Sequence, residues 1–112
     1  MLSPQGFWYN GVMLIFWDFY EIRSSGATLH GIKLRGRIRK FTIENEISCL
    51  MENASDEENV VRFALPTNSN PKPVIDFVEG LMPEAEITES LKNIPNPVLS
   101  KIKVNDPTRY DI

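Results

Sequence analysis

The feature that most constrains the fold of this chain is an alternation of basic and apolar residues over positions 31–41. Five of the twelve Lys and Arg residues fall in this stretch, although the formal net charge is −3. Side chains along a β-strand point alternately to opposite faces, so the pattern predicts an amphipathic strand. One face would carry Lys33, Arg35, Arg37 and Arg39, and the other Ile32, Leu34, Gly36 and Ile38. Neighbouring cations would stand about 6.6 Å apart, a spacing that suits an anion.

This charged face has two interpretations. In the first, it is the solvated polar face that any half-exposed sheet shows. Glu44, Glu46 or Glu52 across the ladder would then pair with the cations, and each exposed ion pair would stabilise the fold by about 0–1 kcal/mol. The functional interpretation rests on the three arginines, because a planar guanidinium binds phosphate or carboxylate in two places at once. We therefore name Lys33, Arg35, Arg37 and Arg39 as the candidate anion-binding residues.

Length and composition indicate one ordinary globular domain. The chain has 112 residues, of which 42% are hydrophobic and 24% charged. A pI near 5.1 disfavours a dedicated nucleic-acid protein, although a local basic face remains compatible with it. The single cysteine, Cys49, excludes an intramolecular disulfide and a cysteine-rich zinc site, and it fits the reducing cytoplasm, where we place the protein.

No segment predicts a membrane partner. The apolar run from Val12 to Trp17 ends at Asp18 and is far shorter than the roughly 20 residues that a membrane-spanning helix needs. A secretory signal is also disfavoured, because the first basic residue is Arg23 and lies after the run rather than before it.

Residues 1–30 stand apart by their aromatic content. Positions 7–20 hold seven of the eleven aromatic residues, and Asn10-Gly11 between them predicts a hairpin with a type I′ turn. This hairpin would be part of the core, an exposed patch that pairs with a second copy or a protein partner, or a leader outside the fold. We divide the chain into this segment, one α+β domain over 31–104, and an irregular tail over 105–112.

The middle of the domain is ambiguous. Helical spacing relates Ile43, Ile47, Leu50 and Met51, with Thr42 as a cap, whereas Ile47, Cys49 and Met51 alternate as in a strand. We prefer a strand pair, 46–53 with 60–66, joined by the polar run 54–59.

The second half is clearer. Pro73 suits a first helical turn, Pro83 ends the helix, and the apolar face between them holds Val74, Phe77, Val78 and Leu81. A strand over 85–91 follows, although Ile87, Leu91 and Ile94 also fit a helix. The Pro95-Asn96-Pro97 turn then leads into a last strand over 98–104.

Catalytic and metal-binding signals are few. His30 is the only histidine, so there is no histidine pair for a metal and no base for a nucleophile. We interpret His30 as a loop residue, Cys49 as an inert core residue, and the acidic run 56–58 as a solvated turn. The glycines are scattered and form no phosphate-cradling loop. We predict no metal site and no cofactor.

Two segments resemble acylphosphatases. Leu34-Arg35-Gly36-Arg37-Ile38-Arg39 resembles the family's first strand, where Gly-Arg-Val-Gln leads into a phosphate-binding loop. Residues 74–87 are similar to its second helix and the junction that follows. The family's Gly-Val-Gly-Phe-Arg loop is missing here, because Lys40-Phe41-Thr42 follows Arg39. The resemblance implies a ferredoxin-like α/β plait, an antiparallel sheet with helices on one face.

We therefore expect a non-catalytic module that binds an anionic ligand or a protein. The alternative is a diverged acylphosphatase, in which Arg39 or Arg37 holds the phosphate and Asn45 orients the attacking water. Such chemistry needs positioning and charge stabilisation rather than a nucleophilic side chain. A third hypothesis is an RNA-binding module that uses the basic face over 33–39, with Phe41 as the one stacking aromatic nearby.

Overall fold

The computed structural model describes residues 6–9, 12–26, 28–30 and 32–104. Seven strands and two helices occupy this part of the chain. In chain order they are β1 (Gly6–Tyr9), β2 (Val12–Arg23), α1 (Leu34–Glu44), β3 (Leu50–Asn53), β4 (Val60–Pro66), α2 (Lys72–Leu81), β5 (Glu86–Pro95), β6 (Pro97–Val98) and β7 (Lys103–Val104). The predicted α+β class is correct.

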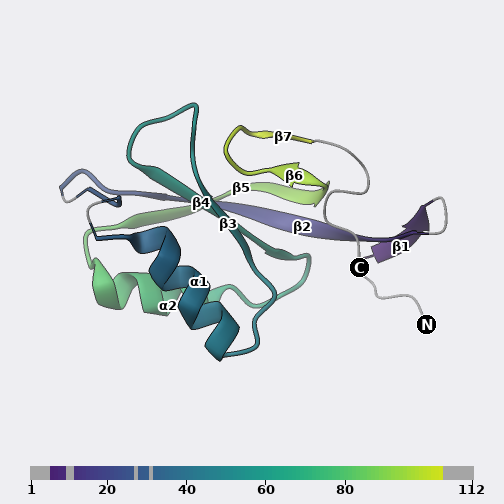
Figure 1. Cartoon of the computed structure of the whole chain (residues 1–112), viewed down its shortest axis with the longest axis horizontal. Helices are drawn as coiled ribbons and strands as arrows, with labels where there is room; N and C mark the ends of the chain where they lie inside the picture. Colours follow the sequence, from purple (N-terminus) through teal and green to yellow (C-terminus); the bar gives the residue numbers. More distant parts are fainter. Residues whose placement is uncertain (1–5, 10–11, 27, 31, 105–112) are drawn as a thin grey trace.

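An antiparallel sheet is built around β2. Strand β4 pairs with one edge of β2 and β5 with the other, and β3 pairs with the outer edge of β4. Strand β1 folds back on the first part of β2. Both helices lie on one side of the sheet, and the β6–β7 hairpin lies on the other (Figure 1).

The two faces of the sheet bury two separate clusters of side chains. On the helix side, Tyr20 stacks on Phe63 with ring centroids 4.9 Å apart, and residues of both helices complete the cluster. On the hairpin side, the cluster consists of Trp17, Phe19, Ala64 and Leu99. Because β2 and β4 are covered on both faces, they have nearly continuous apolar runs instead of clean alternation.

The basic stretch is a helix, so the predicted strand over 31–41 is wrong. Helix α1 buries Leu34, Ile38 and Thr42 against the sheet, at positions i, i+4 and i+8. Leu, Arg and Lys all have good helix propensity, and an apolar residue every second position also supplies one every fourth. A pattern that repeats every second residue therefore also places apolar residues along one face of a helix. Burial of that face against the sheet favours the helix over the strand.

Strand β2, which lies within the N-terminal segment, is part of the sheet. Strand β2 is the centre of the sheet, so the boundary drawn at residue 30 would remove the strand with which β4 and β5 pair. Tyr9 lies opposite Val12 in the β1–β2 pair, which confirms antiparallel pairing of these segments; the turn at Asn10-Gly11 falls outside the described residues. Trp17, Phe19 and Tyr20 are buried, as the core interpretation predicts.

The other elements follow the predictions in part. The strand pair is confirmed for Leu50–Asn53 with β4, whereas 46–49 are not a strand and Ile43 belongs to α1. Helix α2 is confirmed with Pro73 in its first turn, and the strand after it extends to Pro95. Among the described residues, no helix is long and apolar enough to span a membrane.

The predicted last strand over 98–104 is wrong. It is the β6–β7 hairpin, in which the Lys101 N–H donates to the Val98 carbonyl at 3.2 Å. The chain turns at Leu99 because this side chain is fully buried on the hairpin side of the sheet. The tail over 105–112 lies outside the described residues.

One fully buried cation joins the sheet to the hairpin. Arg62 of β4 donates from Nε to Glu21 Oε2 at 2.8 Å and from Nη1 to Asp56 Oδ1 at 2.6 Å. Its Nη1 also donates to the Leu99 carbonyl at 3.2 Å. Arg23 closes the cluster by donating to Glu21 and Glu57. The charge of Arg62 is thus matched by carboxylates from β2 and from the turn between β3 and β4.

The variant Arg62→Met tests the weight of this ion pair. It removes the fully buried partner of the nearly buried Glu21 carboxylate and leaves only the partly exposed Arg23 beside it, so the free energy of unfolding should fall by about 3–5 kcal/mol. The double variant Arg62→Met/Glu21→Met removes both charges and should lose less. Urea denaturation of both variants measures the difference. If the double variant loses as much unfolding free energy as the single variant, or more, the loss in Arg62→Met does not come from the Glu21 charge that it leaves behind.

The same cluster makes stability depend on acidic pH. Burial raises the pKa of the Glu21 carboxyl, but hydrogen bonds from Arg23 and Arg62 outweigh it, so the pKa is lowered overall; the Arg62 hydrogen bond also lowers the pKa of Asp56. Groups with lowered folded-state pKa values stabilise the fold above their unfolded values of about 4 and lose that stabilisation as pH falls. Unfolding free energies measured from pH 7 to 2 should decline below about pH 4, less steeply in Arg62→Met.

Candidate functional site

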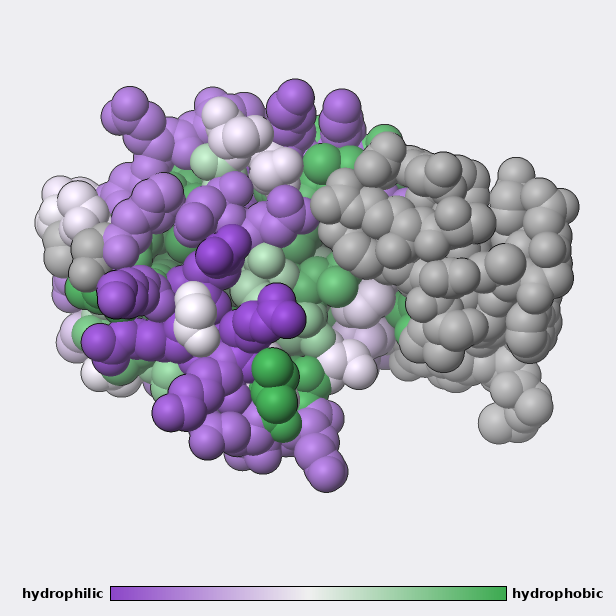
Figure 2. All heavy atoms as spheres, viewed as in Figure 1, coloured by the Kyte–Doolittle hydropathy of each residue, from purple (hydrophilic) through white to green (hydrophobic). Residues whose placement is uncertain are grey.

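Helix α1 divides the predicted ladder of cations between its two flanks. Residues three or four apart share a helix face, so Arg35 and Arg39 lie on one flank and Arg37 and Lys40 on the other, whereas Lys33 is the N-cap residue that precedes the helix. Among the described residues, none of these five cations takes part in an ion pair. Hydrophilic side chains gather over α1 on the face seen in Figure 2. The helix is therefore the positive surface of an acidic protein.

A cleft of about 330 Å³ opens at the start of this helix. We call it the helix-start cleft. It is formed by the loop before α1, the first turn of α1 and the end of β3. Its lining residues are Leu29, His30, Lys33, Leu34, Arg35, Gly36 and Asn53.

The loop before α1 is held by the turn between β3 and β4. Leu29 is fully buried, and its N–H donates to Asn59 Oδ1 at 2.7 Å. The Asn59 amide group in turn donates to the Ser24 carbonyl at 2.9 Å. Lys33 then adopts a left-handed backbone with φ 56°, which costs about 1 kcal/mol in a residue with a side chain. These contacts fix the direction in which the helix begins.

The first turn of α1 favours an anion. Its N-cap residue, Lys33, makes no side-chain capping bond, and no acidic residue lies in the turn. The N–H groups of Leu34 and Arg37 donate to carbonyls of the preceding loop, whereas those of Arg35 and Gly36 lie where a helix supplies no acceptor. A side chain at Gly36 would meet no atom within 4 Å, so the space beside it is open. Backbone donors and two exposed cations thus line the same cleft.

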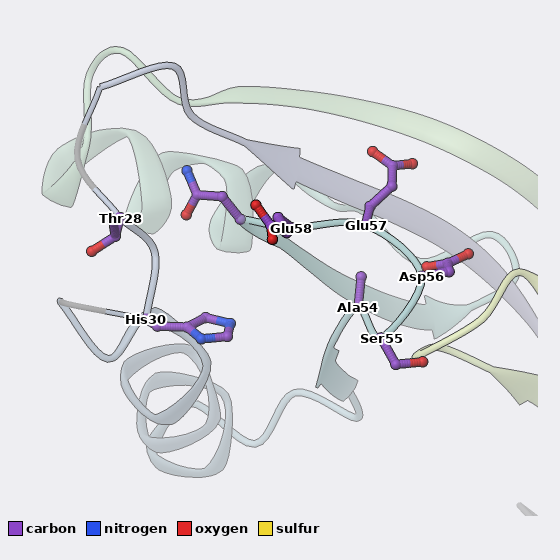
Figure 3. A pocket seen from close by; sticks show the side chains of 8 residues that line it. Thr28, His30, Ala54, Ser55, Asp56, Glu57 and Glu58 are labelled. Atoms are coloured by element: carbon purple, nitrogen blue, oxygen red, sulfur yellow. The ribbon is translucent and has the colours of Figure 1, made fainter.

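His30 also lines a second, neighbouring cleft. This cleft, of about 550 Å³, lies between the loop at Thr28 and the turn over 54–59 (Figure 3). Two of its acidic residues are engaged elsewhere, because Asp56 pairs with Arg62 at 2.6 Å and Glu57 with Arg23 at 2.7 Å. The acidic run is thus partly an ion-paired turn, where we had predicted a solvated one. Among the described residues, no group of three or more His, Cys, Asp or Glu could hold a metal ion.

The structure separates the other predicted site residues. Arg37 lines a groove between α1 and α2, and Arg39 lines a small cleft at the edge of β3. Asn45 ends α1, where its side-chain amide donates to the Phe41 carbonyl at 2.8 Å. Twelve residues of helical rise put Asn45 about 18 Å from Lys33. Asn45 therefore lies at the far end of α1, outside the helix-start cleft, and cannot orient a water for a phosphate bound there.

Asn53 is the residue that our sequence analysis missed. This residue lines the helix-start cleft with Lys33 and Arg35, although it is twenty positions beyond Lys33 in the chain. The available signal was its place at the end of a predicted strand, immediately before the polar run over 54–59.

Cys49 is the inert residue that we predicted. It packs against the helix-side cluster, and its thiol donates to the Leu50 carbonyl at 3.5 Å. Burial raises the pKa of the thiol to about 12, so the nucleophilic thiolate is scarce at neutral pH.

Comparison with protein-family models, with curated proteins and with solved structures gives no match to this chain.

Proposed function

We propose that this protein is a non-catalytic anion-binding module that takes a phosphate-bearing ligand in the helix-start cleft. The observation that carries the proposal is that two cations, Lys33 and Arg35, line the cleft at the first turn of α1 and form no ion pair within the described part of the chain. A phosphate there would accept hydrogen bonds from the Arg35 and Gly36 N–H groups and from both side chains. Hydrogen bonds that involve a charged group contribute about 1.5–3 kcal/mol each.

The order of the elements supports a ferredoxin-like plait as the fold. The central part of the chain runs β2, α1, β3, β4, α2, β5, and the pairings arrange its strands in the order β5, β2, β4, β3. This is the split βαβ arrangement that the acylphosphatase resemblance implies. The strand that leads into the proposed anion site is β2, and the segment over 34–39 that resembles the family's first strand is helical instead.

Asn53 favours acyl phosphate hydrolysis as a second candidate function. Asn53 lines the same cleft as Lys33 and Arg35, and its amide group is of the type that can orient a water beside a bound phosphoryl group. This is the role that the sequence interpretation gave to Asn45. The RNA-binding hypothesis has less support, because it depended on a strand face and the helix splits the cations between two flanks.

Titration with inorganic phosphate tests the anion site. We expect chemical-shift changes at the amides of Arg35, Gly36 and Asn53 in the full-length protein. Lys33→Ala and Arg35→Ala should each weaken phosphate binding about tenfold or more, because each loses a charged contact. Arg39→Ala is the matched control: it removes the same charge one turn away and should leave affinity nearly unchanged. Equal weakening by Arg39→Ala would show diffuse attraction instead of a site.

An assay with acetyl phosphate separates the two candidate functions. Binding without turnover supports the non-catalytic module. Turnover that falls about a hundredfold in Asn53→Ala, while phosphate affinity is retained, would replace it with the hydrolase. Turnover that is insensitive to Asn53→Ala would contradict the proposed role of the amide.

A further inference from the structure

A second surface, which is apolar and flanked by cations, lies on the flank of α1 that carries Arg37 and Lys40. It is a groove of about 420 Å³ between the two helices, and we call it the interhelix groove. Its lining residues are Arg37, Lys40, Phe41, Glu44, Phe77 and Leu81. None of them lines the helix-start cleft, so the two surfaces are independent.

The floor of the groove is aromatic and only partly buried. Phe41 of α1 stacks on Phe77 of α2 with ring centroids 4.4 Å apart and planes 16° from parallel. Both rings and the Leu81 side chain retain solvent exposure. Phe77 and Leu81 are four residues apart, so the wall that α2 contributes is apolar.

The wall that α1 contributes carries positive charge. Arg37 and Lys40 are exposed and lie one helical turn apart. The Arg37 Nε–H donates to the Ile32 carbonyl at 2.8 Å, which holds the guanidinium at the start of the groove. On α2, the residues that line the groove are Phe77 and Leu81, and the Asp76 carboxylate is engaged by Lys72 at 2.8 Å. The two cations therefore face an apolar wall on α2, and the acid in the lining is Glu44 of α1 itself.

We infer that the interhelix groove binds an acidic peptide segment of a protein partner, with a large apolar side chain seated over Phe41 and Phe77. Arg37 and Lys40 pair with the acidic residues that flank this anchor. From Arg37 to Glu44 the groove spans about 10 Å of helical rise, enough for about three residues of extended peptide. Charge complementarity selects the acidic flanks, and burial of the exposed aromatic surface drives the contact.

The same features favour a peptide over a single-stranded nucleic acid. Glu44 closes one end of the groove, where it would repel a nucleic acid, which carries a phosphate at every residue. A peptide can present backbone N–H groups to Glu44 and keep its acidic side chains beside Arg37 and Lys40. Each phenylalanine ring already uses one of its faces on the other, so no gap remains between them for a base.

A probe peptide tests the inference on the full chain. The probe is acetyl-Asp-Glu-Phe-Leu-Asp-Glu-amide, and the control peptide replaces Phe-Leu with Ser-Ser. We expect the probe to shift the amide signals of Lys40, Phe41, Phe77 and Leu81, and the control peptide to bind at least about fivefold more weakly.

Two charge reversals on α1 provide the matched variants. Lys40→Glu should weaken probe binding about fivefold or more, whereas Arg39→Glu reverses one charge on the other flank, outside the helix-start cleft, and should have little effect. Both side chains are exposed, so both variants should fold, as their amide spectra will show. Equal effects of the two variants, no shifts in the groove, or tighter binding of an oligonucleotide than of the probe would each overturn the inference.

Discussion

The buried guanidinium of Arg62 is the interaction on which the rest of the structure depends. It lies in the middle of the sheet and draws together β2 through Glu21, the β3–β4 turn through Asp56 and the C-terminal hairpin through the Leu99 carbonyl. A buried charge is tolerated only with partners in place, so these three segments must assemble together. The far end of the same turn carries Asn59, which holds the loop before α1. The charge cluster on one face of the sheet thereby supports the helix-start cleft at its end.

Helix α1 gives the molecule two different cationic surfaces from one run of basic residues. On a strand, the four candidate anion-binding residues would have formed a single positively charged surface for an anionic ligand. On a helix, the rotation of about 100° per residue sends them to opposite flanks. The flank with Arg35 meets the open first turn and Asn53, which suits a compact anion. The flank with Arg37 and Lys40 meets the aromatic wall of α2, which suits a partner with both apolar and acidic groups.

The elements that sequence analysis predicted well are those with local signals. Helix α2 has prolines before and after an apolar face, and the β3–β4 pair has a polar turn between apolar runs. The failures have equally specific causes. The pattern from Leu34 to Phe41 satisfies both the strand and the helix period, so its local signal was ambiguous. Leu99 interrupts the predicted last strand because its side chain packs into the apolar cluster on the hairpin side of the sheet. The alternation of residues around Leu99 does not reveal this packing.

The amino-acid order by itself determined the α+β class, the concentration of charge over residues 33–40 and the unreactive surroundings of Cys49, since each follows from residues close together in the chain. Only the tertiary structure decided which cations share a surface and that Asn53, rather than Asn45, lies beside Lys33 and Arg35. The physical reason is that a site consists of residues that lie close together in space although they are far apart in the chain. Contacts across the sheet bring β3 beside the start of α1, and no spacing within either segment encodes their meeting.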